Sequence, residues 1–564
     1  MKYADWNLLP TATEELCSKL ASGIIESSIL MHRGITTREE ADHFIRPTVE
    51  DLNDPYLLNN MDKCVTRIST ALTNKERIGV FGDFDTDGLT GTAVLTKGLE
   101  NLGGFIFPYV PHRVKEGHGI SDQAIDFFEK RGVTLIITVD CGTTSITEIT
   151  QASKMGIDTI VTDHHVPTES LPPAVAIVNP SLPDSEYPFP QITGVGTAIK
   201  VMEALYFSLN MEIPNFLYAF CALGTVSDVG LMKGENRYLT QRGIQAIKSE
   251  NIPGIDALIR VSGLTKNRLS SEDLSFGIIP RINVAGRLQH AELSLDLLLT
   301  ENESQAASLA EKLNELNKTR QLLTEKAMRQ ARQQVAKSVR ENGNTLPGMI
   351  FVGQKSWSPG ILGLIASRLV EEFYRPTVAV SGSEEIYRAS ARSVPHFNMI
   401  EAFKKCDDVF EKYGGHSMAA GFTIKGDKLR EFRESLSALT ERDVTQKSQG
   451  SILDIEQEIS PSWINQESLS FLTSLEPFGQ GNPTPTFLSK GMSIMSAKTV
   501  GKDQAHLKLT LEKNDYVYDA IAFRQGQSLG EARGTVDVAY TAGTNYWNGK
   551  ESIQLTIQDF KRSG

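Results

Sequence analysis

Hydrophobic and polar positions change their period along this chain of 564 residues. From Arg77 onward, short apolar runs such as RIGVF, VTLIITV and DTIVT alternate with amphipathic stretches such as LTGTAVLTKGLENL and TEITQASKMG. The short runs have the length of buried strands, and the longer stretches have helical spacing. Strands that alternate with helices are typical of parallel βαβ units. The sequence therefore predicts an α/β domain over residues 76–300, whose last part is mainly helical.

Different patterns flank this domain on both sides. Residues 1–75 are predicted to be a mainly helical lead-in that packs on the α/β domain. Residues 301–345 contain a long polar stretch without Gly or Pro, with Leu at helical spacing, which predicts one connecting helix. Residues 346–445 return to alternating strands and helices, which predicts a second, smaller α/β domain. Residues 446–564 show the period-two alternation of a small β-barrel.

The composition is that of an ordinary globular protein, with 40% hydrophobic and 22% charged residues. No apolar run approaches the roughly 18 residues of a membrane span, and the N-terminus lacks the apolar core of a signal peptide. The five cysteines lie far apart without a CxxC pair, which favours reduced thiols in a cytoplasm over a cysteine zinc site. The net charge of −12 is not that of a typical nucleic-acid binder, although an Asp-rich metal site contributes negative charge of its own.

Carboxylates gather where the first apolar strand ends. The stretch VFGDFDTDGLTG places Asp83, Asp85 and Asp87 on alternate positions. This spacing fits the opening of an EF-hand calcium loop, but the twelfth position, which needs a bidentate Glu, is Val94. Two explanations stay open at this point: another oxygen-ligated divalent ion, or an Asp-rich turn that caps the following helix.

The same order, an apolar run followed by an acid, recurs three more times. VTLIITVD ends in Asp140, and ALGTVSDVG supplies Asp228. DTIVTDHH ends in Asp163, His164 and His165. Because the carboxyl ends of parallel strands meet at one crevice, we expect these side chains to converge. Carboxylates with an imidazole suit Mn²⁺ or Mg²⁺, and there are enough of them for two ions that share a ligand, the layout for in-line attack on phosphorus.

The motifs DFDTDG, DCG, DHH and SDVG, in this order, resemble those of the DHH phosphoesterase superfamily. Further motifs resemble the DHH-associated domain: INVAGRL, SWSPGILGLIASRL, RASARS and YGGHSMAAGF. PFGQGNPTPTF resembles the start of the OB-fold domain of RecJ-like exonucleases, so the resemblance covers nearly the whole chain. It implies an α/β fold: a parallel-sheet DHH domain, a long connecting helix, a smaller α/β DHH-associated domain and a C-terminal all-β OB-fold barrel.

The resemblance also implies roles for the acidic cluster, with two Mn²⁺ or Mg²⁺ ions in the active site. One ion would be held by Asp87, Asp140, His164 and Asp228. The other would be held by Asp85 and the bridging Asp140, with Asp83 close by. Asp163 would fix the ring of the ligating histidine from behind, as such histidines usually require. His165 would face the scissile phosphate.

A basic counterpart is implied for the DHH-associated domain. The candidates to bind phosphate are Arg113, Arg281, Arg287, Ser390, Arg392 and His416. In the family, such a pocket captures the 5′ end of the strand and so sets the direction of digestion, and Arg side chains suit this role because they bind phosphate oxygens bidentately. The barrel would bind the strand further along by stacking on aromatic side chains. Its candidate platforms are Tyr516, Tyr518, Phe523, Tyr546 and Trp547.

The function implied by the resemblance is a single-stranded-DNA-specific 5′→3′ exonuclease that releases 5′-mononucleotides in DNA repair and recombination. The family further suggests a cytoplasmic monomer that works with a single-strand-binding protein and a helicase. A second hypothesis keeps the metal site but assigns oligoribonucleotides, cyclic dinucleotides or pyrophosphate as substrate, and the length of the chain and the barrel count against it. A third is an inactive scaffold that binds DNA, against which every expected Asp and His is present.

Overall fold

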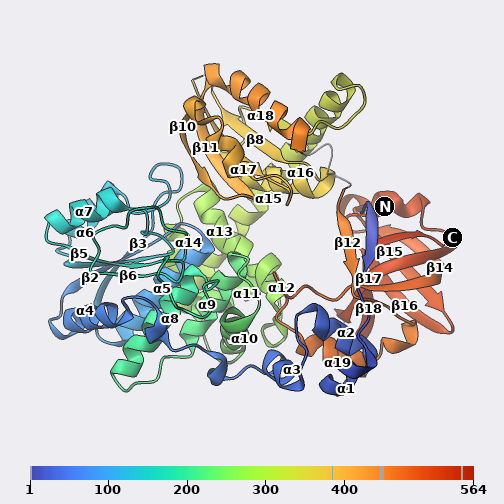
Figure 1. The fold of residues 1–564 in the computed structure, drawn as a ribbon, viewed down its shortest axis with the longest axis horizontal. Helices are drawn as coiled ribbons and strands as arrows, with labels where there is room; N and C mark the ends of the chain where they lie inside the picture. Colours follow the sequence, from blue (N-terminus) through green and yellow to red (C-terminus); the bar gives the residue numbers. More distant parts are fainter. Residues whose placement is uncertain (1–2, 384, 444–449, 548–549, 564) are drawn as a thin grey trace.

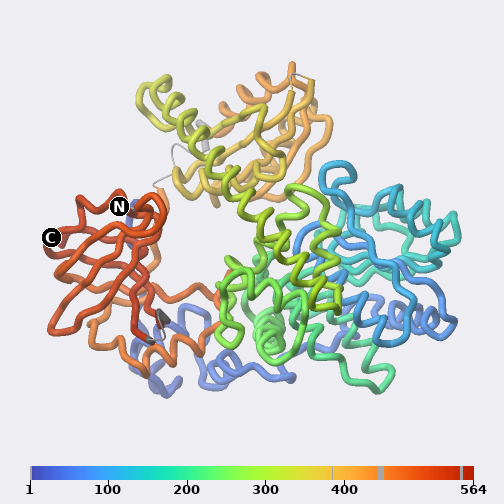
Figure 2. Tube along the Cα trace, turned by 180° about the vertical axis from the view of Figure 1, so that it is seen from behind, coloured from blue at the N-terminus to red at the C-terminus, as the bar shows by residue number. Residues whose placement is uncertain are grey.

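The structure is a computed structural model that describes residues 3–383, 385–443, 450–547 and 550–563. It has three lobes, and Figure 1 shows a large α/β lobe, a smaller α/β lobe above it and a barrel to one side. One long helix runs from the large lobe to the smaller lobe, as the view from behind in Figure 2 shows. Both ends of the chain lie on the barrel (Figure 1). The chain thus makes a circuit through the lobes and returns to where it began.

The sheet of the large lobe is parallel throughout, as predicted, with the strand order β3-β2-β4-β5-β6. Its strands are β2 (Arg77–Gly82), β3 (Phe105–Tyr109), β4 (Leu135–Val139), β5 (Asp158–Thr162) and β6 (Ala176–Val178). Strand β4 is buried along its whole length because helices cover both faces of the sheet. One face is covered by α6 (Asp122–Glu129) and α7 (Ile146–Lys154), and the other by α4 (Met61–Thr73), α5 (Thr86–Asn101) and α8 (Gly194–Ser208).

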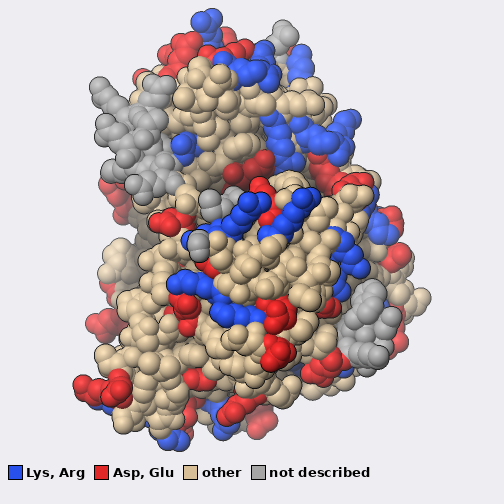
Figure 3. Space-filling view, turned by 90° about the vertical axis from the view of Figure 1, so that its right-hand side faces the viewer, with Lys and Arg blue, Asp and Glu red and all other residues tan. Residues whose placement is uncertain are grey.

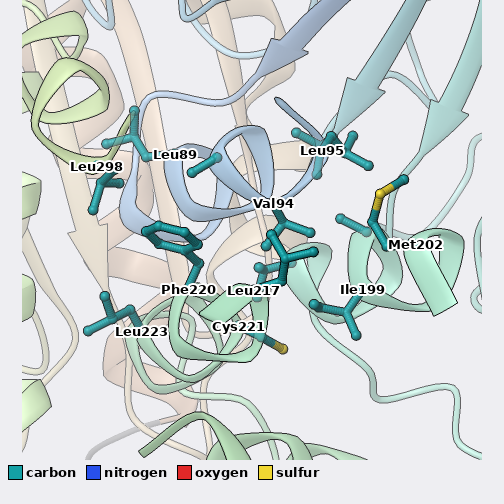
Figure 4. Packing of buried hydrophobic residues seen from close by; sticks show 14 of the residues in the cluster. Leu89, Val94, Leu95, Ile199, Met202, Leu217, Phe220, Cys221, Leu223 and Leu298 are labelled. Carbon is teal, nitrogen blue, oxygen red and sulfur yellow. The ribbon is translucent and has the colours of Figure 1, made fainter. Parts of the chain in front are cut away.

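Helix α5 lies at the centre of the main hydrophobic core. Figure 4 shows its side chains Leu89, Val94 and Leu95 among apolar side chains of α8, α9 (Phe216–Ser227) and α14 (Glu292–Leu299). Phe220 of α9 and Met202 of α8 are both fully buried there. This packing fixes the position of α5 and therefore of the Asp-rich turn at its N-terminus.

A helical layer completes the large lobe and leads out of it. Its remaining helices are α10 (Gly234–Ser249), α11 (Pro253–Ser262), α12 (Ser271–Asp273), a π-helical turn (Leu274–Ile278) and α13 (Ile279–Leu288). The connecting helix α15 (Glu303–Glu341) then runs for 39 residues, as the polar stretch predicted. Neither this helix nor any other in the described ranges is long and apolar enough to span a bilayer.

The smaller lobe has a mixed sheet with the order β10-β11-β9-β8-β7. Only the pair β7–β8 is parallel, and the other neighbours are antiparallel. The strands are β7 (Ile350–Gly353), β8 (Thr377–Gly382), β9 (Ile386–Arg392), β10 (Phe410–Gly415) and β11 (Ala419–Lys425). The helices are α16 (Leu362–Phe373), α17 (Met399–Lys404) and α18 (Leu429–Asp443).

The third lobe is a closed barrel, as predicted. Its strands are β14 (Phe487–Val500), β15 (His506–Lys513), β16 (Tyr516–Ala522), β17 (Thr535–Trp547) and β18 (Lys550–Arg562). They follow the order β14-β15-β16-β18-β17, and β14 also pairs with β17, which closes the barrel. The barrel is preceded by β12 (Ile452–Ile455), β13 (Gln457–Glu458) and α19 (Gln466–Ser474). β17 and β18 form an antiparallel hairpin, whose turn at Asn548 and Gly549 lies outside the described residues.

The lead-in differs from the prediction that residues 1–75 pack on the α/β domain. Strand β1 (Asp5–Leu8) pairs in parallel with β12, beside the barrel (Figure 1). Helices α1 (Glu14–Leu20), α2 (Ile24–His32) and α3 (Arg38–Ile45) bury their apolar side chains in the core of the barrel lobe. The later part, from about Leu52 through α4, packs in the core of the large lobe. The mainly helical character of the lead-in is confirmed, but α1, α2 and α3 cover the barrel lobe, whose core residues run from Ile459 to Phe560.

Candidate metal centre and phosphate pocket

The acidic side chains from the ends of β2, β4 and β5 converge at the carboxyl edge of the parallel sheet. Asp228 joins them from the C-terminus of helix α9, not from a strand end as its apolar run suggested. Their ligand atoms fall into groups within 4.8 Å of one another, of which one contains Asp83, Asp85 and Asp140 and another contains Asp87, His164 and Asp228. Asp140 and His165 also form a group with His164. These groups contain the side chains that the resemblance implies for the two ions, although Asp140 falls outside the group of Asp87, His164 and Asp228. Asp140 lies between the two groups, since its Oδ1 is 3.1 Å from His164 Nε2. Metal binding by these residues stays a prediction.

The Asp-rich turn serves two purposes at once. Asp85 caps helix α5, because its Oδ1 accepts hydrogen bonds from the backbone N–H groups of Asp87 and Gly88 at 3.0 and 3.3 Å. Asp87 points the other way and accepts hydrogen bonds from the N–H groups of Gly194 and Val195, at 2.9 and 3.0 Å. The N-terminus of α8 therefore faces a carboxylate, as helix N-termini favour. Capping and metal binding are thus compatible explanations of this turn.

Asp140 needs a glycine next to it. Its φ of 60° is in the left-handed region, which a residue other than glycine seldom adopts. A Cβ at Gly194 would lie 2.6 Å from the Asp140 Cβ, so no larger residue fits at the start of α8 without displacement. The sequence analysis missed this role of Gly194, because the contact joins two segments that no local pattern connects.

The contacts of the three residues of the DHH motif differ from those expected. Asp163 accepts a hydrogen bond from Nδ1 of His165 at 2.7 Å, and it also accepts one from the N–H of Thr143 at 3.1 Å. The ring of His164 instead faces Asp140, with Asp228 Oδ2 at 4.0 Å. The expectation that Asp163 fixes the ring of His164 is therefore wrong. Asp163 orients the neighbouring His165.

Two further side chains belong to the centre and were missed. Nδ1 of His118 lies 3.3 Å from Asp83 Oδ2, and its ring packs edge-on against His165 with the centroids 5.3 Å apart. The loop EGHGIS that carries it gave no metal signal. Asn283 accepts a hydrogen bond from the N–H of Thr86 and donates one to Ser227 Oγ, at 3.1 and 3.3 Å. Asn283 lies in the INVAGRL motif, which was recognised without a role for this residue.

The electrostatics of the centre call for a cation. Burial first, and then the charges of neighbouring aspartates, raise the pKa values of Asp85, Asp87 and Asp140 above their usual range. Burial and Asp85 raise the pKa of Asp228 to about 7. Burial and the charge of His165 lower the pKa of His164 to about 4, which keeps this imidazole neutral. Asp83 Oδ1 is buried without a hydrogen-bond partner. Oxygen ligands with one neutral imidazole fit Mn²⁺ or Mg²⁺.

A pocket of arginines lies beside the centre. Arg392 Nη1 donates to Ser390 Oγ at 3.0 Å, and Gly363 at the start of α16 lies directly against both side chains. Burial, together with the charges of Arg113, Arg320 and Arg392, lowers the pKa of Arg287 to about 9. Neighbouring like charges disfavour the charged form, and an anion bound among these arginines would offset the repulsion. The geometry thus brings Arg113, Arg287, Ser390 and Arg392 near one another. Phosphate binding by this set, which the resemblance implies, stays a prediction.

The other two candidates for phosphate binding, His416 and Arg281, have different surroundings. The ring of His416, from the smaller lobe, stacks on His165 with the centroids 6.4 Å apart, so this lobe reaches the metal centre. Arg281 donates to Asn314 Oδ1 at 3.0 Å and to the carbonyl of Gly277, so it is bonded between α13 and α15. The structure does not bring Arg281 into the pocket.

The aromatic side chains of the barrel that are candidates for base stacking differ in how deeply they are buried. The hydroxyl of Tyr518 donates to the carbonyls of Pro461 and Ile464, and the ring is buried, so Tyr518 is a core residue. Tyr516 and Phe523 are 44% and 55% exposed and can meet a ligand. The side chains of Tyr546 and Trp547 lie outside the described part of the chain. Figure 3, which views the barrel side of the molecule, shows Lys and Arg intermixed with Asp and Glu.

Comparison with known proteins agrees with this architecture. The DHH family, N-terminal domain, matches residues 77–225, the DHHA1 domain matches residues 346–442, and the RecJ OB domain matches residues 455–559. The single-stranded-DNA-specific exonuclease RecJ of Bacillus subtilis is 33% identical over 537 residues, 94% of this chain and 67% of that protein. RecJ of Escherichia coli is 33% identical over 550 residues, 93% of this chain and 94% of that protein. The chain belongs to the RecJ family.

A solved RecJ structure confirms the fold. The crystal structure of RecJ in complex with Mn²⁺ from Thermus thermophilus matches with a TM-score of 0.83 and 28% identity, covering 99% of this chain and 80% of that chain. A second structure of the same protein contains Mg²⁺, with a TM-score of 0.77 and 27% identity. The predicted fold class, the parallel-sheet DHH domain with an associated domain and an OB-fold barrel, is confirmed.

Proposed function

We propose that this chain is a metal-dependent exonuclease that degrades single-stranded DNA from its 5′ end to 5′-mononucleotides, in DNA repair and recombination. The observation that carries the proposal is the proximity of the carboxylate cluster, with its two groups of candidate ligands, to the cluster of arginines, since the charge of Asp85 acts on the pKa of Arg287. The RecJ relatives described as single-stranded-DNA-specific exonucleases support the substrate, and the Mn²⁺ and Mg²⁺ complexes of the Thermus protein support the cofactor.

The metal ligands follow from the two groups of donor atoms. Asp87, Asp140, His164 and Asp228 would hold one divalent ion, and Asp83, Asp85 and Asp140 would hold the other. When bound, such ions lower the pKa of a water molecule and stabilise the charge that develops on phosphate oxygens. The surrounding backbone prepares the site, because N–H groups of α8 fix Asp87 and the capped turn fixes Asp85.

His165 is the residue placed to meet the scissile phosphate. Burial is the largest influence and lowers its pKa, but the hydrogen bond to Asp163 and the charge of that carboxylate together outweigh burial, so the pKa of His165 is raised and the charged donor form is favoured. Its side chain is 31% exposed and lies between the rings of His164 and His416. His165 would therefore donate a hydrogen bond to a phosphate oxygen while Asp163 holds the ring in place.

The arginine pocket sets the direction of digestion. Arg392, Arg287 and Ser390 offer donors to a terminal phosphate, which carries more negative charge than a phosphate inside the strand. A strand whose 5′ phosphate is held there presents its first internucleotide bond to the metal centre. Hydrolysis of that bond releases one nucleotide and creates a new 5′ phosphate for the next cycle.

We also propose that the protein acts as a cytoplasmic monomer on strands that a helicase unwinds and a single-strand-binding protein covers. The metal centre and the arginine pocket both lie within one copy of the chain, which supports a monomer. Light scattering at working concentration measures the oligomeric state, and a dimeric mass would contradict this proposal.

The decisive experiment is a Mn²⁺-dependent digestion of one oligonucleotide, labelled at its 5′ or its 3′ end and offered as a single strand or a blunt duplex. We expect immediate release of labelled mononucleotide from the 5′-labelled single strand, and none with EDTA. Early release from the 3′ label would contradict the polarity. Strand binding without digestion would support the inactive scaffold instead, and digestion of very short oligomers alone would support the alternative substrates.

A further inference from the structure

A buried arginine of the large lobe holds the segment that leads into the barrel. Arg237, on α10, is 1% exposed. Its Nη1 donates to the carbonyls of Leu475 and Pro477 at 2.9 and 3.2 Å, and its Nη2 donates to the carbonyl of Glu476 at 2.9 Å. Its Nε donates to the carbonyl of Phe44 in the lead-in at 2.8 Å, and the guanidinium lies 3.9 Å from the Phe44 ring.

A second arginine extends the same network from the lead-in. Arg33 follows helix α2 and donates to Asn482 Oδ1 and to the carbonyl of Pro483, at 2.7 and 2.6 Å. It also pairs with Glu456 at 2.9 Å. Asn482 in turn donates to the carbonyls of Leu475 and Pro477. We call residues 475–483, with Arg33 and Arg237, the clasp.

The clasp is bonded to the segment that follows Asp228 of the metal centre. The N–H of Met232 donates to the carbonyl of Gln480 at 2.7 Å, and Met232 lies four residues after Asp228. Lys233 Nζ donates to the carbonyl of Arg33 at 3.0 Å, and Ser271 Oγ donates to the carbonyl of Phe478 at 2.8 Å. The segment from Asp228 to Lys233 thus carries a candidate metal ligand at its start and contacts the clasp at its end.

Ordinary domain packing explains this arrangement poorly. Lobes of one chain usually move relative to one another unless a large apolar interface joins them. Here the attachment consists largely of hydrogen bonds to main-chain carbonyls, supplemented by side-chain contacts with Asn482, Glu456 and the ring of Phe44. Burial lowers the pKa of Arg237 to about 10. A guanidinium carries five N–H donors in a fixed planar arrangement, and that of Arg237 makes four hydrogen bonds here. Hydrogen bonds from such a planar group fix the orientation of residues 475–477 relative to α10, whereas an apolar contact would not fix it.

We propose that Arg237 is a positioning residue, which holds the barrel at a fixed distance and orientation from the metal centre so that both grip one strand together. This inference rests on the proposed exonuclease activity. When two linked sites grip one strand, the second site binds with an effective concentration that depends on how rigidly the sites are joined. A higher effective concentration retains the strand for longer. Arg237 therefore controls how many nucleotides are removed in each encounter with a long strand, and it leaves the chemistry at the metal centre unchanged.

The test compares Arg237→Lys with the wild type on two 5′-phosphorylated single strands, one of about four nucleotides and one of about sixty. Only the long strand supplies nucleotides for the metal centre and also the roughly 4–16 nucleotides that an OB fold binds. Steady-state assays give kcat and KM, and a chase with excess unlabelled strand gives the number of nucleotides removed per encounter. For the long strand we expect KM to rise about tenfold and the number removed to fall about tenfold. Both constants for the short strand should stay within about twofold.

Arg242→Lys is the matched control, since Arg242 lies on the same helix but bonds to Asn215 and packs on Tyr218 within the large lobe. It should behave as the wild type on both strands. If Arg237→Lys does not fold, as judged by its melting temperature, Ser271→Ala removes a single clasp hydrogen bond and should show a smaller loss on the long strand only. Equal losses on both strands, or no loss on the long strand in a folded variant, would overturn the proposal. A wild type that cleaves neither strand would instead overturn the proposed function.

Discussion

Asp140 combines two unfavourable properties at a single residue. Its backbone is in the left-handed region, which costs about 1–3 kcal/mol for a residue other than glycine. Its carboxylate is buried beside other aspartates, which raise its pKa further. A folded protein retains such a residue only when the surroundings hold it in place, and strain of this kind gathers at functional sites. A bound cation would relieve the repulsion among the aspartates.

Replacing Asp87 with Ala removes a ligand that the N-terminus of α8 holds in position. We expect the rate of Mn²⁺-dependent digestion to fall more than about a hundredfold, because even partners that merely orient metal ligands contribute ten- to a hundredfold. Binding of single-stranded DNA, measured by fluorescence anisotropy, should persist. Asp126→Ala, an exposed aspartate on α6, is the control and should keep its full rate. A variant at Asp87 that retains most of its activity would show that the metal site is misassigned.

Replacing Arg392 with Ala opens the phosphate pocket. Its guanidinium is bonded to Ser390 and lies among other arginines. The loss of a charge-assisted hydrogen bond predicts a decrease of about ten- to a hundredfold in kcat/KM on strands with a 5′ phosphate. Strands with a 5′ hydroxyl should be affected much less. Arg430→Ala, on the exposed face of α18, is the control. An equal decrease on both kinds of strand would contradict the pocket.

Asp228 makes the stability of the metal-free protein depend on pH. Its pKa is about 7 in the folded protein and 3.8 ordinarily, so between these values the folded protein retains a proton that the unfolded chain has lost. The free energy of unfolding contributed by Asp228 therefore decreases as the pH rises from about 4 to about 7. In EDTA, the melting temperature of Asp228→Asn should increase relative to the wild type across this range. A constant difference between the two proteins would contradict the shift.

At the scale of elements, local patterns in the sequence were sufficient for much of the fold and the centre. Apolar runs followed by Asp85, Asp140 or Asp163 predicted both the strands and the edge where their side chains meet, because that edge follows from parallel pairing. His118 and Gly194 were missed, since their roles depend on contacts between loops and helices far apart in sequence. The pairing of β1 with β12 was missed for the same reason.

Replacing Gly194 with Ala tests the junction between two elements. The new Cβ would meet the Asp140 Cβ at 2.6 Å, so α8 or the turn after β4 must shift. We expect the free energy of unfolding to fall by about 1–3 kcal/mol, as overpacked cores do, and the digestion rate to fall as well. Urea denaturation and the nuclease assay measure these effects. At Gly543 in β17 an added Cβ meets nothing within 4 Å, so Gly543→Ala should leave both quantities nearly unchanged.

At the scale of the whole molecule, the lead-in links the barrel to the large lobe a second time. Ile29 of α2 is fully buried in the core of the barrel lobe, whereas Ile24 of the same helix is 50% exposed. Truncating a buried Ile to Ala costs about 2–5 kcal/mol. Ile29→Ala should lower the free energy of unfolding of the barrel lobe by this amount, and Ile24→Ala by much less. Similar effects of the two substitutions in urea denaturation would mean that α2 is not part of this core.

The pairing of β1 with β12 has a consequence for the synthesis of the protein on the ribosome. Asp5 lies opposite Ile452, so the first strand leaves the ribosome long before its partner is made. At about 5–20 residues per second, the interval is roughly 20 to 90 seconds. Throughout that time the apolar faces of the first helices have no barrel to cover them. The nascent chain must therefore avoid association of these exposed apolar faces with other proteins until the barrel emerges.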